Sequence, residues 1–396
     1  MKIHINKNLI LLFNDVFAFG LAILTSLIIT RIFGLYYLGL SVFYFVFVGP
    51  LISIFRFSID KKILALLDLE YVPSLHTIAY GSNIIIFLFG FLLAISIGDN
   101  YYEKLFLVMV LLLRLAQVNL NYLVNFKIRT AQYKQILRLL LIVYILPVLI
   151  ILALYLLNYD SKKVFYLYIL FFLCSVSVIF FREVKINLKG FDINIKEQFS
   201  LTARDFLVTM KTAVPRYFMD LLLGREMLGI VAICQQLAQL LDILPGVLIK
   251  VSSSKMVALV NRSELGKMKL LRKSLILQII FSLIILIFVL WTVRIPIFTL
   301  LYRIDEYPGL FLLMSFMTVR GLANITNVDK FILNVFSSSV LTIAPLLKIL
   351  IFLSMSYLIM IMIKLESEYI VVIPLIFSEI VLYIQHRNRV NNLFLS

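Results

Sequence analysis

The stretch that decides the fold reads Lys211-Thr-Ala-Val-Pro-Arg-Tyr-Phe-Met-Asp220, continued by Leu-Leu-Leu-Gly224-Arg-Glu-Met-Leu-Gly229-Ile. It is hydrophobic, yet it carries charges and a proline, and it ends in two glycines separated by four residues. A similar ending occurs near the N-terminus, where Thr30-Arg31-Ile-Phe precedes Gly34-Leu-Tyr-Tyr-Leu-Gly39-Leu. Both copies read Gly-x-x-x-Leu-Gly plus an aliphatic residue, at an offset of 190 residues. The repeat predicts a duplicated chain in which each half begins with a helical hairpin.

The composition is that of an integral membrane protein. Hydrophobic residues make up 62% of the 396 residues and charged residues 15%, whereas soluble domains are about 45–50% apolar and about 25% charged. The net charge of +16 comes from basic residues clustered between hydrophobic runs. This placement is typical of cytoplasmic loops and argues against nucleic-acid binding. The two cysteines lie in apolar runs and the three histidines are scattered, so neither a disulfide framework nor a metal motif is predicted.

Hydrophobic segments long enough to cross a bilayer recur along the whole chain. A helix needs about 20 apolar residues to do so. The first segment lacks a cleavage site and is expected to remain as a span. The start of the eleventh depends on whether the polar segment 324–339 forms a turn or the foot of a helix. The twelve predicted spans are 9–30, 35–55, 77–97, 105–125, 138–157, 164–181, 203–223, 227–250, 273–293, 308–323, 331–355 and 369–385.

The basic residues predict the orientation of these spans. With the N-terminus inside, the inside segments hold 24 Lys and Arg residues and the outside segments hold 8, so both termini should be cytoplasmic. Arg320 is interpreted as one of these topology determinants. Twelve spans divide into six plus six, which predicts a parallel repeat of residues 1–190 and 191–396. Five basic residues fall inside spans, namely Arg114, Lys211, Arg216, Lys250 and Lys348.

Polar residues recur at helical spacing inside four spans. A charge in the middle of a bilayer costs at least about 2.5–3.5 kcal/mol, so it should face protein or water. The spacing places these residues on single helix faces and predicts a hydrated, mainly cationic cavity. The faces comprise Arg114, Gln117, Asn121 and Asn125 in the fourth span, Asp205, Thr209, Thr212, Arg216 and Asp220 in the seventh, Gln235, Gln239 and Asp242 in the eighth, and Asp15, Ser26 and Thr30 in the first.

Several of these residues also have a purely structural interpretation. Arg31 and Lys250 lie at span ends, where a long basic side chain can reach the membrane surface. Lys348 lies at mid-span or near an end, depending on where the eleventh span begins. Arg216 and Asp220 are four residues apart and can neutralise each other. Such pairing explains how the two charges are tolerated but does not explain why they are present.

Two residues favour a functional interpretation more directly. Arg114 has no acidic residue within its own span, so a bound anion is an attractive partner for it. Pro215 directly precedes Arg216, and a proline removes a helical hydrogen bond and bends the helix. We interpret Pro215 as a candidate hinge, with a static kink as the alternative.

Three motifs resemble a known family: Thr30-Arg31-Ile-Phe-Gly34…Gly39-Leu, Ser58-Ile-Asp60-Lys, and Val214-Pro215-Arg216-Tyr217…Gly224…Leu228-Gly229-Ile. They are similar to the polysaccharide-exporter branch of the multidrug/oligosaccharidyl-lipid/polysaccharide (MOP) superfamily, and most of all to the Wzx-like O-antigen flippases. The resemblance extends over the whole chain in span number and length. It implies an all-α membrane protein made of two six-helix bundles, V-shaped around a central cavity.

The resemblance also implies a function and a set of roles. Such proteins move an undecaprenyl-pyrophosphate-linked oligosaccharide across the bacterial cytoplasmic membrane by alternating access. Basic residues would hold the pyrophosphate, Arg31 and Arg216 by the motifs and Arg114, Lys211, Lys250 and Lys348 by the polar faces. Gln117, Asn121, Asn125, Gln235 and Gln239 would face sugar, and Asp15, Asp220 and Asp242 would serve H⁺ or Na⁺ coupling. No other cofactor is implied. The implied partners are the lipid-linked oligosaccharide, membrane lipids, a polysaccharide polymerase and a chain-length regulator.

Two alternatives remain open at this stage. A drug/cation antiporter of the same superfamily would favour acidic cavities, whereas here the basic residues in the membrane match or outnumber the acidic ones. A membrane enzyme such as a polysaccharide polymerase, ligase or acyltransferase would need a sizeable polar loop or a His/Asp set. The longest predicted outside loop, 294–307, is short, and the histidines have no such partners. The sequence therefore predicts a transporter and not an enzyme.

Overall fold

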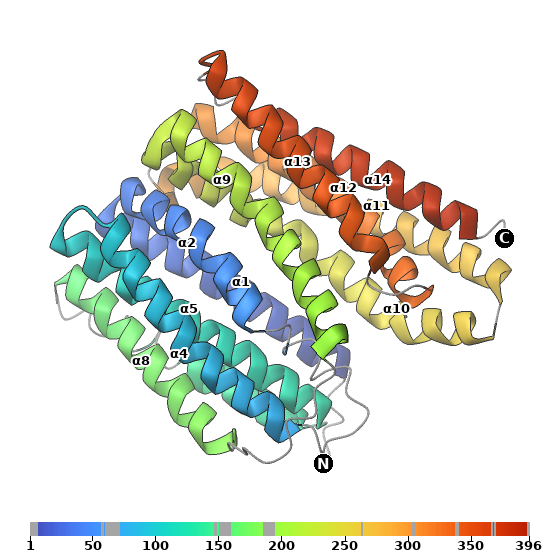
Figure 1. Cartoon of the computed structure of the whole chain (residues 1–396), viewed down its shortest axis with the longest axis horizontal. Coiled ribbons are helices and arrows are strands. Elements are labelled where there is room, and N and C mark those ends of the chain that lie inside the picture. The colour runs from blue at the N-terminus through green and yellow to red at the C-terminus, as the bar shows by residue number, and fades with distance from the viewer. Residues whose placement is uncertain are drawn as a thin grey trace. The chain divides into compact units, whose positions relative to one another are not determined.

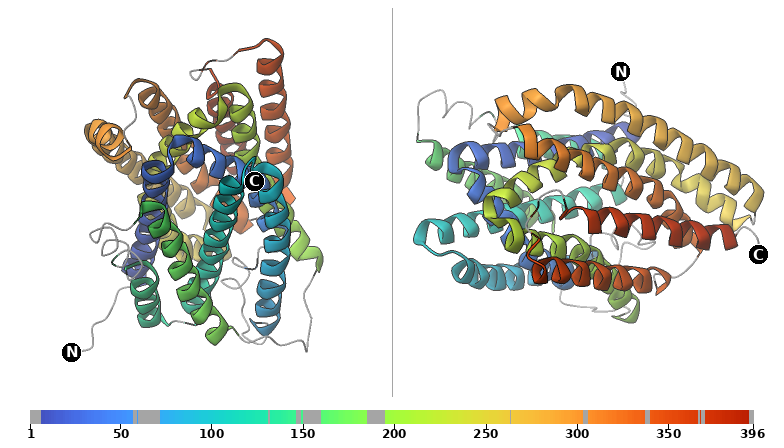
Figure 2. Two further views of the ribbon diagram at one scale, coloured as in Figure 1. Left: turned by 90° about the vertical axis from the view of Figure 1, so that its left-hand side faces the viewer. Right: turned by 90° about the horizontal axis from the view of Figure 1, so that it is seen from above.

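The protein is described by a computed structural model covering residues 7–56, 59, 72–130, 132–145, 149, 160–184, 195–262, 264–302, 306–336, 340–365, 367 and 370–393. Within these ranges the chain forms helices joined by short turns, without strands (Figures 1 and 2). The first half contains α1 (Lys7–Phe33), α2 (Leu35–Phe55), α4 (Val72–Ile97), α5 (Tyr101–Arg129), α6 (Tyr133–Leu140), the π-helix η2 (Leu141–Ile145) and α8 (Ser161–Glu183).

The second half continues in the same manner. Its elements are α9 (Ile195–Ala238), the 3₁₀-helix η3 (Gln239–Asp242), α10 (Ile243–Asn261), α11 (Leu265–Ile295), the π-helix η4 (Pro296–Tyr302), α12 (Glu306–Phe336), α13 (Val340–Met362) and α14 (Ile373–Leu393). Eight helical stretches among the described residues are long and apolar enough to cross a membrane. The chain is therefore a multi-pass, all-α membrane protein, as the sequence predicts.

The predicted spans agree with the helices except at two places. The fifth, 138–157, begins in α6 and η2, and most of its remainder lies outside the described residues. The eleventh begins at Val340, not at residue 331, because α12 continues to Phe336. The polar residues that suggested a turn have partners within the fold. Asn324 donates to the carbonyl oxygen of Leu241 at 3.1 Å and Asp329 pairs with Arg272, so the helix carries them without a break.

The two glycine hairpins have the same backbone conformation. Gly34 has φ 93° and ψ 172° between α1 and α2, and Gly224 has φ 80° and ψ 173° inside α9. This region is essentially restricted to glycine, and no other described glycine has a positive φ. Each is followed by a buried Leu-Gly-aliphatic segment, 38–40 in one copy and 228–230 in the other. The predicted repeat is thus present in three dimensions.

The break in α9 also corrects the predicted position of the kink. The non-helical residue inside α9 is Gly224, nine residues after Pro215. The chain stays helical through Pro215, which is buried. The seventh and eighth spans are therefore separated at the glycine, and the hinge role of Pro215 stays a prediction.

Packing divides the chain into two compact units. Unit 1 contains residues 1–10 and 32–213, and unit 2 contains residues 11–31 and 214–396. In unit 1, α4 packs on α2 and α5, and α5 on α8. In unit 2, α11 packs on α10 and α12, and α12 runs beside α14 (Figure 1). The order of neighbours is the same in both units, as a duplication requires. The predicted boundary at residues 190/191 lies outside the described residues and stays a prediction.

Alanine at either hairpin glycine should destabilise the protein. Nothing lies within 4 Å of a Cβ added at Gly34 or Gly224, so the whole effect comes from backbone strain, about 1–3 kcal/mol at each position. Gly246→Ala on α10 is the matched control, because a Cβ there also meets open space and alanine favours a helix. Unfolding of each variant in detergent, followed by circular dichroism, checks this. Equal stability of all three variants would contradict it.

Candidate functional site

The helix α5 presents a polar face at mid-length. Its start is fixed by Asn100, whose side chain accepts a hydrogen bond from the Glu103 amide at 2.9 Å, while Glu103 Oε1 accepts from Asn100 Nδ2 at 3.0 Å. Such a reciprocal cap anchors the first turn. All residues from 103 to 128 are described, and the exposed ones among them are Arg114 and Asn121, seven residues apart on one face. Gln117 lies between them and is half-buried.

Other membrane helices expose apolar residues instead. On α4 the exposed line is Ile84, Leu88, Phe91 and Ile95, and on α11 it is Leu277, Phe281, Ile284 and Phe288. These are the stripes expected of helices that face lipid tails. The exposed face of α5 differs from them in chemistry, because it offers a guanidinium and amides. It therefore has the character of a face lining water or a polar ligand.

Arg114 is held loosely by neighbours in unit 1. Its Nη1 donates to Gln117 Oε1 at 3.3 Å, and its guanidinium lies 5.9 Å from the centre of the Phe45 ring on α2. Both partners are uncharged, so these contacts orient the side chain without cancelling its charge. Asn125, one turn further along the predicted face, is half-buried.

In unit 2 the structure brings together Arg216 and Gln235, which come from the two helical segments on either side of Gly224. Arg216 donates from Nε and Nη2 to Gln235 Oε1, at 3.0 and 2.7 Å. This fork fixes the plane of the guanidinium. Gln235, predicted to face sugar, thus contacts the predicted anion-binding arginine directly.

Asp220 has an ionic partner that the sequence analysis did not name. Its Oδ1 lies 2.9 Å from Nε of Arg225, and the pair spans Gly224. The Asp220 side chain is 9% exposed. This ion pair joins the two sides of the hairpin, so Asp220 contributes to holding the second glycine turn. A role of Asp220 in ion coupling stays a prediction.

Asp242 is the centre of a charged cluster between η3 and α12. Arg320 Nη1 donates to its Oδ2 at 3.0 Å, and Asn324 Nδ2 donates to its Oδ1 at 2.9 Å. Arg320 lies in the middle of α12, so its interpretation as a loop residue that sets topology is wrong. The sequence signal was available, because Arg320 and Asn324 are four residues apart within a helical run.

The other predicted site residues are not brought into these clusters by any contact described above. Arg31 is exposed in the last turn of α1, Lys211 is half-buried in unit 1, and Gln239 is half-buried in η3. Lys348 is exposed on α13 among apolar residues such as Ile351 and Phe352, which is the surrounding expected of a lipid-facing position. Asp15 and Lys250 lie in α1 and α10, with side chains outside the described set.

A second polar network in unit 1 was missed by the sequence analysis. Arg56, counted there as a loop residue, is 2% exposed. It donates from Nη1 to Asn83 and Asn119 Oδ1 at 3.4 and 3.3 Å, and from Nη2 to the Val118 carbonyl at 3.3 Å. Asn83 in turn donates to Asn119 at 2.9 Å. The network joins α4 and α5 to the end of α2 and has the character of a structural core.

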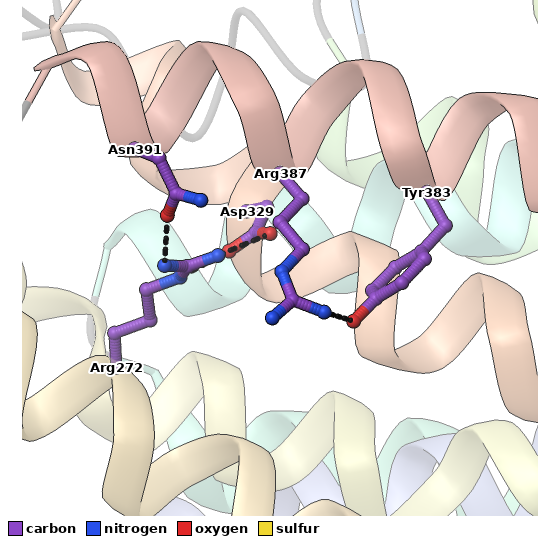
Figure 3. Close-up of polar contacts among 5 residues, drawn as sticks. All are labelled: Arg272, Asp329, Tyr383, Arg387 and Asn391. Atoms are coloured by element: carbon purple, nitrogen blue, oxygen red, sulfur yellow. Dashed lines mark hydrogen bonds and ion pairs between the residues drawn. The ribbon is translucent and has the colours of Figure 1, made fainter.

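A third cluster joins three helices of unit 2 (Figure 3). Arg272 on α11 donates from Nε and Nη2 to the two carboxylate oxygens of Asp329 on α12, at 2.6 and 2.8 Å. Its Nη1 donates to Asn391 on α14 at 3.0 Å. Nearby, Arg387 Nη1 donates to the Tyr383 hydroxyl at 2.7 Å. Because Asp329 is 1% exposed, this cluster serves cohesion of the bundle and does not offer a free charge.

These features define a polytopic helical membrane protein with polar, arginine-bearing faces in each of two repeated units. Solved structures with the same architecture are transporters of the MOP superfamily. An inward-facing multidrug resistance MATE family transporter matches with a TM-score of 0.58 and 13% identity, over 99% of this chain and 97% of its own. An outward-facing MATE family transporter matches with a TM-score of 0.55 and 14% identity, over 98% and 93%.

A third such structure is a MOP superfamily transporter from Pyrococcus furiosus, described as having a binding pocket of reverse polarity that suggests a different function. It matches with a TM-score of 0.54 and 13% identity, over 97% of this chain and 94% of its own. No protein-family model matches the sequence, and no curated protein sequence matches it. The chain therefore has the fold of the MOP superfamily transporters, as the resemblance in the sequence predicts.

Proposed function

We propose that the protein is a flippase that moves undecaprenyl-pyrophosphate-linked oligosaccharide units, such as O-antigen repeats, across the bacterial cytoplasmic membrane by alternating access. Both termini would be cytoplasmic. The protein would bind and move its substrate without altering it chemically, and H⁺ or Na⁺ would supply any coupling. A polysaccharide polymerase and a chain-length regulator are the protein partners consistent with such a role.

One observation carries the proposal: the exposed face of α5 bears Arg114 and Asn121 where other membrane helices expose leucine, isoleucine and phenylalanine. A positive charge is costly at mid-membrane unless water or an anion accompanies it. A pyrophosphate is a compact anion that a guanidinium binds through two hydrogen bonds. The amides beside Arg114 can replace water around sugar hydroxyls, while the polyprenyl chain stays in lipid.

Arg216 supports the same substrate class from unit 2. Gln235 fixes the orientation of its guanidinium through an uncharged contact, and a pre-oriented donor loses less freedom when it binds. The predicted pyrophosphate contacts from the motifs and from the polar faces thus include one arginine in each unit whose geometry is described. The roles of Arg31, Lys211, Lys250 and Lys348 in the same binding are part of the proposal.

A drug antiporter is the second candidate, because two of the structures with this fold are multidrug resistance transporters. The charges on the described polar faces favour an anionic substrate over a cationic drug. The Pyrococcus transporter, described as having reverse pocket polarity, supports the view that one fold serves substrates of different charge.

The test is deletion of the gene in its own host, with analysis of surface polysaccharide and of lipid-linked intermediates. A flippase predicts loss of the polymer and accumulation of lipid-linked single repeats on the cytoplasmic side, reversed by the wild-type gene. Surface lipid capped with one repeat would indicate a polymerase. A normal polymer with changed drug sensitivity would indicate the antiporter.

A further inference from the structure

Two arginines of unit 2 contact the same polar line on the segment that follows Gly224. The line consists of Gln235, Gln239 and Asp242. In a 3₁₀-helix, residues three apart lie above one another, so Gln239 and Asp242 share one side of η3, and Gln235 lies four residues earlier on α9. Arg216 is bound at Gln235, and Arg320 is bound at Asp242.

The two contact points are separated along the helix axis by roughly 10 to 12 Å, given a rise of about 1.5 Å per residue in α-helix and about 2.0 Å in 3₁₀-helix. A headgroup with two phosphates followed by sugars is long enough to contact both points in turn. The line therefore offers two positions for one anionic group, with the Gln239 amide between them.

The two positions differ in the charge of the partner. Gln235 is an amide and leaves the charge of Arg216 uncompensated by that contact. Asp242 is a carboxylate and cancels the charge of Arg320. The Arg320 and Asp242 side chains are 32% and 36% exposed, so a solute can reach the pair. Arg320 is therefore a cation near mid-helix that is accessible but already occupied.

Asp242 is held independently of Arg320. Its Oδ1 accepts from Asn324 Nδ2 at 2.9 Å, and that amide also donates to the Leu241 carbonyl at 3.1 Å. Glu379 on α14 adds a second negative charge close enough to act on Asp242. An incoming anion can thus take Arg320 while Asp242 keeps a hydrogen-bonding partner, and the repulsion between Asp242 and Glu379 limits how tightly the internal pair holds.

We propose that Arg320 is a second binding residue for the phosphate groups of the substrate, and that Asp242 is an internal anion that occupies Arg320 until the headgroup displaces it. The proposal rests on the proposed function and adds a binding residue and a competitor to it. The competitor keeps Arg320 from retaining the headgroup after transfer, since each phosphate contact must be exchanged against Asp242.

Binding of farnesyl pyrophosphate to the purified full-length protein in nanodiscs tests this. Asp242→Asn removes the competing charge and should tighten binding by roughly tenfold, a coupling of ordinary size. The double variant Asp242→Asn/Arg320→Gln should lose that gain. Farnesol, which lacks the phosphates, should bind all variants equally, and circular dichroism should show the same helix content throughout.

The outcomes separate this inference from the proposed function. Binding by the wild type that weakens in Arg114→Gln but does not change in Asp242→Asn would overturn the inference and leave the flippase standing. Tighter binding that persists in the double variant would also overturn it, because Arg320 would not be the residue released. Failure of the wild type and all variants to bind would overturn both proposals.

Discussion

Replacing Arg114 by glutamine is expected to reduce export of the polysaccharide by about 10- to 100-fold. A hydrogen bond to a charged group contributes about 1.5–3 kcal/mol, and each 1.4 kcal/mol is about tenfold. Glutamine keeps the polarity and much of the length of the side chain, so the loss reports the charge. Arg114 is exposed and its described partners, Gln117 and Phe45, are uncharged. The variant should therefore fold and reach the membrane at the wild-type level.

The measurement is surface polysaccharide in the deletion strain carrying each variant, normalised to the amount of protein in the membrane. Arg114→Lys should lie between the wild type and the glutamine variant, because lysine keeps the charge but cannot form the two parallel bonds of a guanidinium. Lys273→Gln is the control, since Lys273 is an exposed basic residue of α11 outside the polar faces. Wild-type export by Arg114→Gln would remove Arg114 from the site.

Features that repeat locally along the chain were predictable from the sequence. Span length and hydropathy located the helices, and the Gly-x-x-x-Leu-Gly repeat located both hairpins because the backbone at Gly34 and Gly224 admits only glycine. The polar face of α5 was predictable for the same reason. Its residues recur at helical spacing in one helix, so no knowledge of neighbouring helices was needed.

Features that depend on which helix meets which were not predictable in this way. Arg56 and Arg320 looked like loop residues because positive charges near span ends are usually topological. The structure pairs them with Asn119 and Asp242, which are 63 and 78 residues away in the chain. Gln235 was assigned to sugar because its partner Arg216 lies across a glycine break whose geometry a single helix pattern does not encode. Partner choice of this kind arises from tertiary packing.

Removing the carboxylate of Asp329 should cause the largest loss of stability. Its two oxygens accept from Nε and Nη2 of Arg272 at 2.6 and 2.8 Å, and the two side chains are 1% and 12% exposed (Figure 3). Breaking a buried pair by changing one partner leaves an uncompensated charge and costs about 3–5 kcal/mol. We therefore expect Asp329→Asn and Arg272→Gln each to lower the free energy of unfolding by about this amount, measured by titration with sodium dodecyl sulfate in mixed micelles.

A double replacement distinguishes charge pairing from simple loss of packing. Arg272→Met combined with Asp329→Leu removes both charges and retains much of the volume, and such exchanges are often neutral or stabilising. The double variant should therefore be more stable than either single variant, although Asn391 loses its partner as well. Glu264→Gln is the control, because Glu264 pairs with the exposed Lys267 three residues away and exposed pairs add little. Losses that simply add in the double variant would show that the cluster stabilises α11, α12 and α14 through shape, with no contribution from the pairing of the two charges.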